Sequence, residues 1–253
     1  MMRKLLLGAA AILAVSATAG VAAADTSTIG VHAGNLEGDS GDDVDFWGLS
    51  GGWNHDFSNG WAIQADGEWD RVDIGTETGS SYGAIALGTR NDAYSLYGFA
   101  GLSDTLASSG ISYGIGGEFY VSNFVFGASL GHTDLEQAIL PEADLTSLDL
   151  DATWFFTPNF GVSGQLGWSE AEVFTSDVDW ESYGVGAVWR FAGSPISLTG
   201  RYRHDEFDGG EVDGWRLGVN FNFGTDTAQE QATRGPSWAG ARNLYEDSYV
   251  FLP

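Results

Sequence analysis

The chain contains no cysteine among its 253 residues, so no disulfide holds it together. A fold without disulfides must rest on hydrogen bonding and packing alone. Positive charge is also scarce, with 10 Lys and Arg against 35 Asp and Glu and a net charge of −25. Binding to nucleic acid depends on neutralising phosphates with basic side chains. Nucleic acid is therefore excluded as a partner on grounds of charge.

Long hydrophobic runs are missing as well, apart from residues 5–15 near the start. That run follows Arg3 and Lys4 and precedes the small residues Ala22, Ala23 and Ala24. The order of charge, apolar segment and small residues predicts a secretory signal peptide over residues 1–24, cleaved near Ala24. An uncleaved anchor is the alternative, but the run is short for a span that needs about 20 residues. The remaining chain offers no transmembrane helix, and we expect an exported protein.

Aromatic residues and glycine, in contrast, are abundant: 10 Trp, 15 Phe, 9 Tyr and 37 Gly. An exported, cysteine-free chain rich in both is typical of a β-barrel. The sequence after the leader divides into about a dozen runs of roughly ten residues, the length that a tilted membrane strand needs. Most runs alternate with period two. In residues 213–224, for example, one face carries Trp215, Leu217, Val219, Phe221 and Phe223. Runs near residues 81–89 and 93–102 alternate poorly, and no face is assigned there.

The connections between the runs also alternate in length. Short links at residues 58–60, 90–92, 122–123, 157–159 and 192–195 alternate with longer, acidic ones such as residues 36–43, 133–144 and 169–177. Short periplasmic turns and longer outer loops are the pattern of outer-membrane barrels. Aromatic residues gather at both ends of the runs, as two membrane interfaces require. A soluble β-sandwich shares the alternation but gives no reason for two aromatic belts.

Across residues 25–223 the chain thus resembles small porin-like β-barrel proteins of the Gram-negative outer membrane. The resemblance implies an all-β fold, a transmembrane antiparallel up-and-down barrel of about 12 strands. It also implies contact with outer-membrane lipid, lipopolysaccharide and the barrel assembly machinery. Such barrels usually end on an aromatic residue, which Phe223 would be, yet residues 224–253 follow. We expect a C-terminal periplasmic extension; the alternative is a plug that enters the lumen, with Arg234 and Arg242 meeting an acidic wall.

Charged residues on the predicted inner face are unevenly placed. Basic residues share the last three strands and acidic residues lie opposite, an arrangement that sets selectivity in many pores. Small inward residues and a strand count above eight favour open space. The alternative is that the charges pair across a filled barrel. The predicted lumen-lining residues are Arg190, Arg201, Arg203, Arg216, Asp66, Glu68, Glu118, Asp149, Asp151 and His32.

The leading functional prediction is a porin-like channel for passive diffusion of small hydrophilic solutes or ions, and not an enzyme. A structural or adhesin-type barrel that acts through acidic outer loops is the alternative. An outer-membrane hydrolase is the third hypothesis, since residues 55–60 read His-Asp-Phe-Ser-Asn-Gly. Asn59-Gly60 is, however, a strong hairpin signal, which predicts a turn there. No cofactor motif or spaced metal-binding pattern is present, and a homo-oligomer stays an open question.

Overall fold

The computed structural model describes residues 25–39, 43–73, 77–105, 108–137, 143–173 and 176–248. The predicted signal peptide lies outside the described residues. Within the described part of the chain, no helix is long and apolar enough to cross a bilayer.

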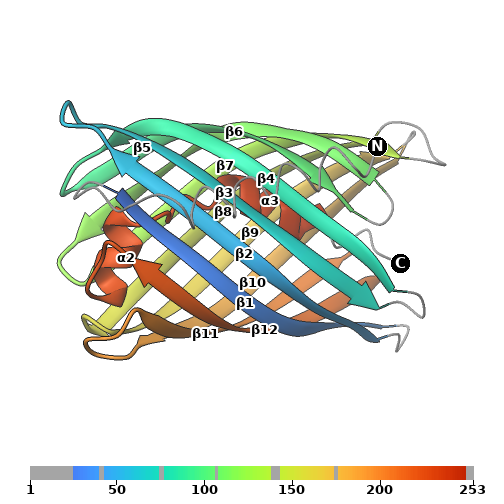
Figure 1. Ribbon diagram of the computed structural model, residues 1–253. Helices are drawn as coiled ribbons and strands as arrows, with labels where there is room; N and C mark the ends of the chain where they lie inside the picture. The colour runs from blue at the N-terminus through green and yellow to red at the C-terminus, as the bar shows by residue number, and fades with distance from the viewer. Residues whose placement is uncertain are drawn as a thin grey trace.

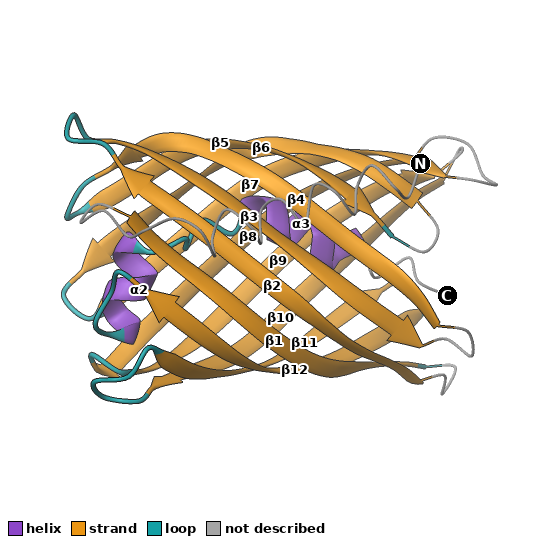
Figure 2. Ribbon diagram, viewed as in Figure 1, coloured by secondary structure: helices purple, strands orange, loops and turns teal. Residues whose placement is uncertain are grey.

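Twelve antiparallel strands form one closed barrel in which β12 pairs with β1 (Figures 1 and 2). Each strand pairs with its neighbours in sequence, so the connectivity is up-and-down. The predicted all-β, twelve-stranded transmembrane-type barrel is confirmed. The strands are β1 (Asp25–Gly38), β2 (Asp43–Asp56), β3 (Trp61–Asp73), β4 (Glu77–Arg90), β5 (Tyr94–Asp104), β6 (Ser108–Val121), β7 (Phe124–Gln137), β8 (Ala143–Thr157), β9 (Phe160–Val173), β10 (Ser176–Arg190), β11 (Ile196–Phe207) and β12 (Gly210–Phe223).

The strands are longer than the sequence pattern predicted, at 11 to 15 residues instead of about ten. Only two to five residues separate consecutive strands at either end of the barrel. The prediction of long outer loops is therefore wrong. The acidic segments continue the strand alternation: on β9, Glu170 and Glu172 point outward while Ser169 and Ala171 point inward. Carboxylates that alternate with small inward residues extend the sheet beyond the membrane, where water solvates them.

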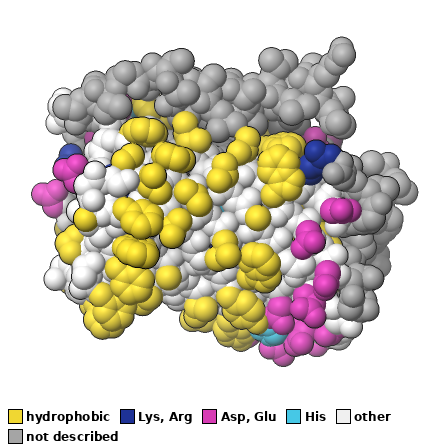
Figure 3. Space-filling view, turned by 60° about the horizontal axis from the view of Figure 1, so that its bottom comes forward, with side chains coloured by type: hydrophobic (Ala, Val, Ile, Leu, Met, Phe, Trp, Pro, Cys, Tyr) yellow, Lys and Arg dark blue, Asp and Glu magenta, His cyan; other side chains and the backbone are white. Residues whose placement is uncertain are grey.

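The outer wall carries a band of exposed apolar side chains between two aromatic belts. At one belt, the rings of Trp47 and Trp69 meet edge to face at 5.4 Å. At the other, Trp154 packs against Phe156, with ring centroids 3.9 Å apart. Figure 3 shows the hydrophobic side chains over the visible wall and the acidic side chains gathered towards one end. We call that end the acidic end, and the opposite one, which carries the turn at residues 57–60, the turn end.

After β12 the chain forms two short helices, α2 (Ala228–Arg234) and α3 (Gly240–Ser248). Helix α2 covers the turn end, where the backbone N–H of Gln229 donates to the Pro158 carbonyl at 2.9 Å. Helix α3 lies inside the barrel, against β4 to β8 (Figure 2). Of the two helices, only α2 thus lies where a periplasmic extension was expected. Helix α3 adopts the alternative, a plug within the lumen.

The apolar core lies in the lumen, not between sheets. Strands β4 and β5 direct Tyr82, Tyr97 and Phe99 inward, where they pack with Leu244 and Tyr245 of α3. These two strands are the ones whose faces the sequence left unassigned. Their alternation is poor because one face meets lipid and the other meets the plug, so both faces are apolar.

Inward glycines provide the space for this packing. A Cβ atom at Gly116 would lie 2.4 Å from Cζ of Tyr97, and one at Gly131 would lie 2.5 Å from Cδ1 of Leu244. The small inward residues were expected to leave open space. At these positions an aromatic ring and the plug occupy that space.

Candidate functional site

The candidate site is the lumen together with the segment that enters it, residues 235–248, which we call the plug. Its anchor is Trp238, only 2% exposed. The indole stacks on Tyr97 at 4.7 Å, lies 4.6 Å from the guanidinium carbon of Arg90, and donates through Nε1 to Ser95 at 3.0 Å. Its backbone N–H and carbonyl bind the amide of Gln64 at 3.0 and 2.7 Å. The side chain and backbone of this one residue therefore fix the plug to strands β3, β4 and β5.

The apolar face of α3 is made by residues spaced three and four apart, as an amphipathic helix requires. Ala241, Leu244 and Tyr245 are all buried on this face. The Tyr245 hydroxyl donates to Asp70 at 3.1 Å and contacts the Ser80 hydroxyl at 2.7 Å. Burying each large apolar side chain contributes about 1.5–3 kcal/mol. This face holds α3 against the wall of the barrel.

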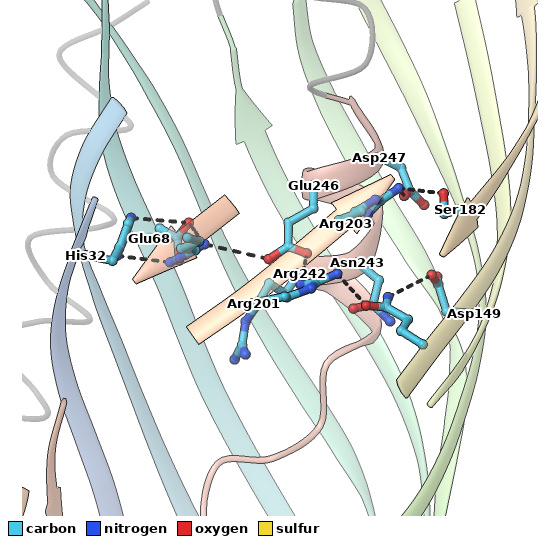
Figure 4. A network of polar contacts seen from close by, with 12 residues as sticks. His32, Glu68, Asp149, Ser182, Arg201, Arg203, Arg242, Asn243, Glu246 and Asp247 are labelled. Atoms are coloured by element: carbon cyan, nitrogen blue, oxygen red, sulfur yellow. Dashed lines mark hydrogen bonds and ion pairs between the residues drawn. The ribbon is translucent and has the colours of Figure 1, made fainter. Parts of the chain in front are cut away.

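The polar face of α3 meets the arginines of the opposite wall (Figure 4). Glu246 forms an ion pair with Arg201 and lies 3.6 Å from Nη1 of Arg216. Asp247 pairs with Arg203. The predicted arginine wall is thus paired with carboxylates of the plug. The alternative of internal ion pairs had placed the partners on the opposite wall of the barrel.

The charge of Glu246 is strongly favoured by this position. Burial alone would raise its pKa, but the positive charges of Arg201, Arg216, Arg203 and Arg242 outweigh burial and lower the pKa to about 2. Glu246 therefore stays ionised wherever these arginines surround it. Together with Asp247, which pairs with Arg203, this carboxylate supplies the charged contact between the plug and the arginine wall.

His32 belongs to a separate cluster at the β1–β3 side. Its Nδ1 accepts from Nη2 of Arg216 at 2.9 Å, so its Nε2–H donates to Asp70 at 2.6 Å. Arg216 also binds both oxygens of Glu68, at 2.8 and 2.5 Å. The groups of His32, Glu68 and Asp70 lie within 4.8 Å of one another, close enough for a metal ion. The guanidinium of Arg216 already supplies positive charge there.

These contacts bear on the hydrolase hypothesis. Both nitrogens of His32 are engaged, which leaves it no lone pair to act as a base. His55 lies on the outer wall beside Asp25, and Ser58 lies in the turn that precedes Gly60. All four histidines fall within the described ranges, and none of them hydrogen-bonds to a serine there. A nucleophile activated by histidine is therefore absent from the described lumen.

The predicted acidic residues differ in how well they are satisfied. Asp66 accepts from Gln64 at 2.8 Å and from Tyr82 at 3.0 Å. Glu118 accepts from Ser95, Tyr120 and Ser237, all through Oε2. Asp149 accepts from Ser147 at 3.0 Å and from Gln165 at 3.4 Å. Asp151, in contrast, accepts no hydrogen bond from the part of the chain that the structure describes.

Arg190 is the one predicted arginine that lies apart from the ring around α3. It sits at the turn end and donates to the carbonyls of Thr225, Ser194 and Thr227 at 2.5, 3.1 and 3.3 Å. Its guanidinium therefore fixes the connection from β12 to α2. Arg190 was predicted to line the lumen with the other arginines; in the structure its side chain anchors the C-terminal tail.

Space remains beside the plug. A cavity of about 240 Å³ lies between the plug and strands β6 to β9, and one of about 90 Å³ lies towards the acidic end. Arg201 lines both cavities, and it is held by Glu246 and by Oε1 of Gln165. A third cavity of about 570 Å³ opens at the turn end beside α2. The plug therefore narrows the lumen, and Arg201 borders two of the spaces that remain.

The comparisons with known proteins support the fold. No protein-family model and no curated protein matches the chain. Among solved structures, the chain is similar to an outer membrane channel from Pseudomonas putida F1, with TM-score 0.59 and 9% identity, covering 78% of this chain and 94% of that one. It is also similar to the translocator domain of the autotransporter NalP from Neisseria meningitidis, with TM-score 0.55, 12% identity, and 87% and 94% covered.

A third similar structure is the KdgM porin, with TM-score 0.52 and 11% identity, covering 76% of this chain and 98% of that one. At such identities the likeness concerns the fold alone. The chain has the outer-membrane β-barrel fold that porins and autotransporter translocators share. The predicted resemblance is confirmed at that level.

Proposed function

We propose that the protein is a porin-like outer-membrane channel for passive diffusion of small hydrophilic solutes or ions, narrowed by its own C-terminal plug. The observation that carries this proposal is the pair of lumen cavities that share Arg201 as a lining residue. Arg201 borders both spaces and is held by Glu246 of the plug. Movement of the plug would join them into one polar path.

The orientation follows from the chain ends. Because the number of antiparallel strands is even, the start of β1 and the end of β12 lie at the same end of the barrel, the turn end, which α2 covers. We place that end in the periplasm. The acidic end would then face outward, next to lipopolysaccharide, while lipid contacts the apolar band. Residues 1–24 would direct export, and the barrel assembly machinery would insert the strands.

Selectivity would depend on which charges become free when the plug moves. Arg203 would remain paired with Asp205, whose carboxylate lies 2.7 Å away, and Arg216 would remain paired with Glu68. Among the described residues, Arg201 forms an ion pair only with Glu246 of the plug, so its charge would be exposed to solutes. Changing Arg201 and Arg203 to Ser should shift ion selectivity towards cations, read as a change in reversal potential under a salt gradient.

The direct test is single-channel recording of the mature protein refolded into a planar bilayer, with and without residues 224–253. We expect discrete conductance steps, and a larger conductance in the shortened protein. Folding of both proteins is verified by β-sheet circular dichroism. Silence from both folded proteins would discard the channel.

The filled lumen also favours a second candidate, a closed barrel that acts through its acidic end. Cross-strand pairs there oppose like charges: Glu172 faces both Asp144 and Asp177, and Glu206 faces both Glu181 and Glu211. Such pairs destabilise a sheet. If the lumen does not conduct, we infer that these carboxylates serve a binding function at the acidic end. Binding of the protein to host cells or surfaces, combined with silence in bilayers, would support this candidate.

A further inference from the structure

We propose that the larger lumen cavity, of about 240 Å³, is a binding site for a small zwitterionic solute of the free amino acid class. The inference rests on the proposed function, because a solute must enter the lumen to reach the site. The cavity lies between the plug and strands β6 to β9. Four charged groups line it, the carboxylates of Glu118 and Asp151 and the guanidinium groups of Arg201 and Arg242. The ligand is assigned to Asp151 of β8 and Arg242 of α3.

Asp151 supplies the negative side. It lies directly opposite Gly127 in register, and a Cβ at Gly127 would lie 2.2 Å from its Oδ1. The missing side chain at Gly127 therefore leaves room for the carboxylate. Throughout the described ranges no group donates a hydrogen bond to Asp151. A nearby second carboxylate, Glu118, binds its three donors through Oε2 and adds negative charge on the same side.

Arg242 supplies the positive side. Its Nε donates to the Tyr82 hydroxyl at 3.2 Å, which fixes the direction of the guanidinium. Its terminal nitrogens, Nη1 and Nη2, have no hydrogen-bond partner among the described residues. Arg201, the other cation of the cavity, is engaged by Glu246 and Gln165. Arg242 is thus the cation with donors left for a ligand.

The opposite charges do not pair with each other. In the described part of the chain no hydrogen bond or ion pair joins Asp151 to Arg242. The carboxylates whose charges act on Arg242 are Asp66 and Glu246, and the cation whose charge acts on Asp151 is Arg201. A cation alone would leave the Nη1 and Nη2 donors of Arg242 unused, and an anion alone would leave Asp151 without a donor. A molecule with an ammonium and a carboxylate satisfies both, through charge-assisted hydrogen bonds.

Size and the rest of the lining agree with this class of ligand. A water occupies about 30 Å³ in the liquid, so the cavity has the volume of about eight waters, enough for a small amino acid. Polar side chains between the two charges offer further hydrogen bonds: Ser129, Ser163, Gln165 and Asn243. The net charge of −25 repels anionic solutes, whereas a zwitterion carries no net charge.

The experiment is a ligand-observed NMR titration of the full-length protein in detergent. L-Alanine is compared with isopropylamine, which lacks the carboxylate, and with propionate, which lacks the ammonium. We expect alanine to bind on the order of tenfold more tightly than either analogue, since each analogue loses one charge-assisted contact. Asp151→Asn should weaken alanine binding about tenfold for the same reason. Asp177→Asn, which changes an outward carboxylate at the acidic end, is the matched control and should change nothing.

Each outcome decides a separate question. Equal binding of alanine and isopropylamine would show a simple cation site and overturn the proposal, as would no binding of alanine. The comparison of analogues uses the unmodified protein, so it holds even where a variant folds poorly. Bilayer recordings on the same preparation test the channel independently. Conduction without binding of alanine would support the channel and refute the binding site. Binding of alanine without conduction would support the binding site and refute the channel.

Discussion

Glu246→Gln is the substitution that most directly probes how the plug is held. It keeps the shape of the side chain and removes its negative charge. In the native protein that charge lies between Arg201 and Arg216, in a side chain only 15% exposed. After the change, the positive charges of both arginines face a neutral amide.

The magnitude follows from the burial of the partners. Removing one partner of a buried ion pair costs about 3–5 kcal/mol. The side chains of Arg201 and Arg216 are 28% and 24% exposed, and Arg216 retains Glu68. Water and the remaining carboxylate reduce the cost, so we expect a loss of about 2–3 kcal/mol in the docking of the plug. Since each 1.4 kcal/mol is a factor of ten, the ratio of undocked to docked protein should rise about 30- to 140-fold.

The assay is single-channel recording in a planar bilayer, scored as the fraction of time in the larger conductance state. Glu230→Gln is the control, because Glu230 lies on α2 at the turn end and a glutamine there preserves the capping contact with Asp226. Removing both charges, with Arg201→Gln added to Glu246→Gln, should cost less than the two single changes together. An open fraction equal to that of the unmodified protein, from folded Glu246→Gln protein, would refute the argument.

Three further predictions concern the plug and its packing. The pKa of Glu246 is about 2 in the docked state and 4.5 ordinarily. Its contribution to the docking of the plug is therefore complete above pH 4.5 and is lost as the pH falls towards 2. Bilayer recordings in which the pH is lowered from 4.5 towards 2 should show rising conductance. Trp238→Ala removes the buried anchor at a cost of about 3–5 kcal/mol, and tryptic cleavage of the tail should become faster; the lipid-facing change Trp189→Ala should leave the cleavage rate unaltered. Gly116→Ala places a Cβ 2.4 Å from an aromatic ring and should cost about 1–3 kcal/mol in urea unfolding, while Gly98→Ala, whose nearest neighbour is 3.7 Å away, should not shift the midpoint.

The strands were predictable wherever one face meets lipid and the other is polar. On β12, Trp215 and Leu217 alternate with Arg216 and Gly218, and the structure pairs them as the pattern requires. The boundaries were less predictable, because the alternation continues through acidic segments such as residues 169–173, which composition alone presents as a loop. Alternation with period two therefore identifies a strand, whereas an acidic composition indicates only that the residues are exposed to water.

The positions of the charged lumen residues also followed from alternation, but their partners did not. Arg201 and Glu246 are 45 residues apart and belong to different kinds of structure. Helix α3 has only nine residues, too few to be stable alone in water, so its helical form depends on the barrel around it. The apolar spacing of Ala241, Leu244 and Tyr245 was the available signal, and it marks a helix face that needs a wall to pack against.

The connection between α2 and α3 has a consequence for how the lumen responds to change. Helix α2 is fixed at the turn end, where the carbonyl of Arg234 accepts from Thr26 at 3.0 Å and from Asn54 at 3.2 Å. Only residues 235–239 separate that fixed point from α3. A released α3 would stay at an effective concentration in the millimolar range, as short tethers impose. Opening and closing are then an intramolecular equilibrium with one blocker for each barrel. The fraction of open barrels would not depend on how much protein the membrane holds.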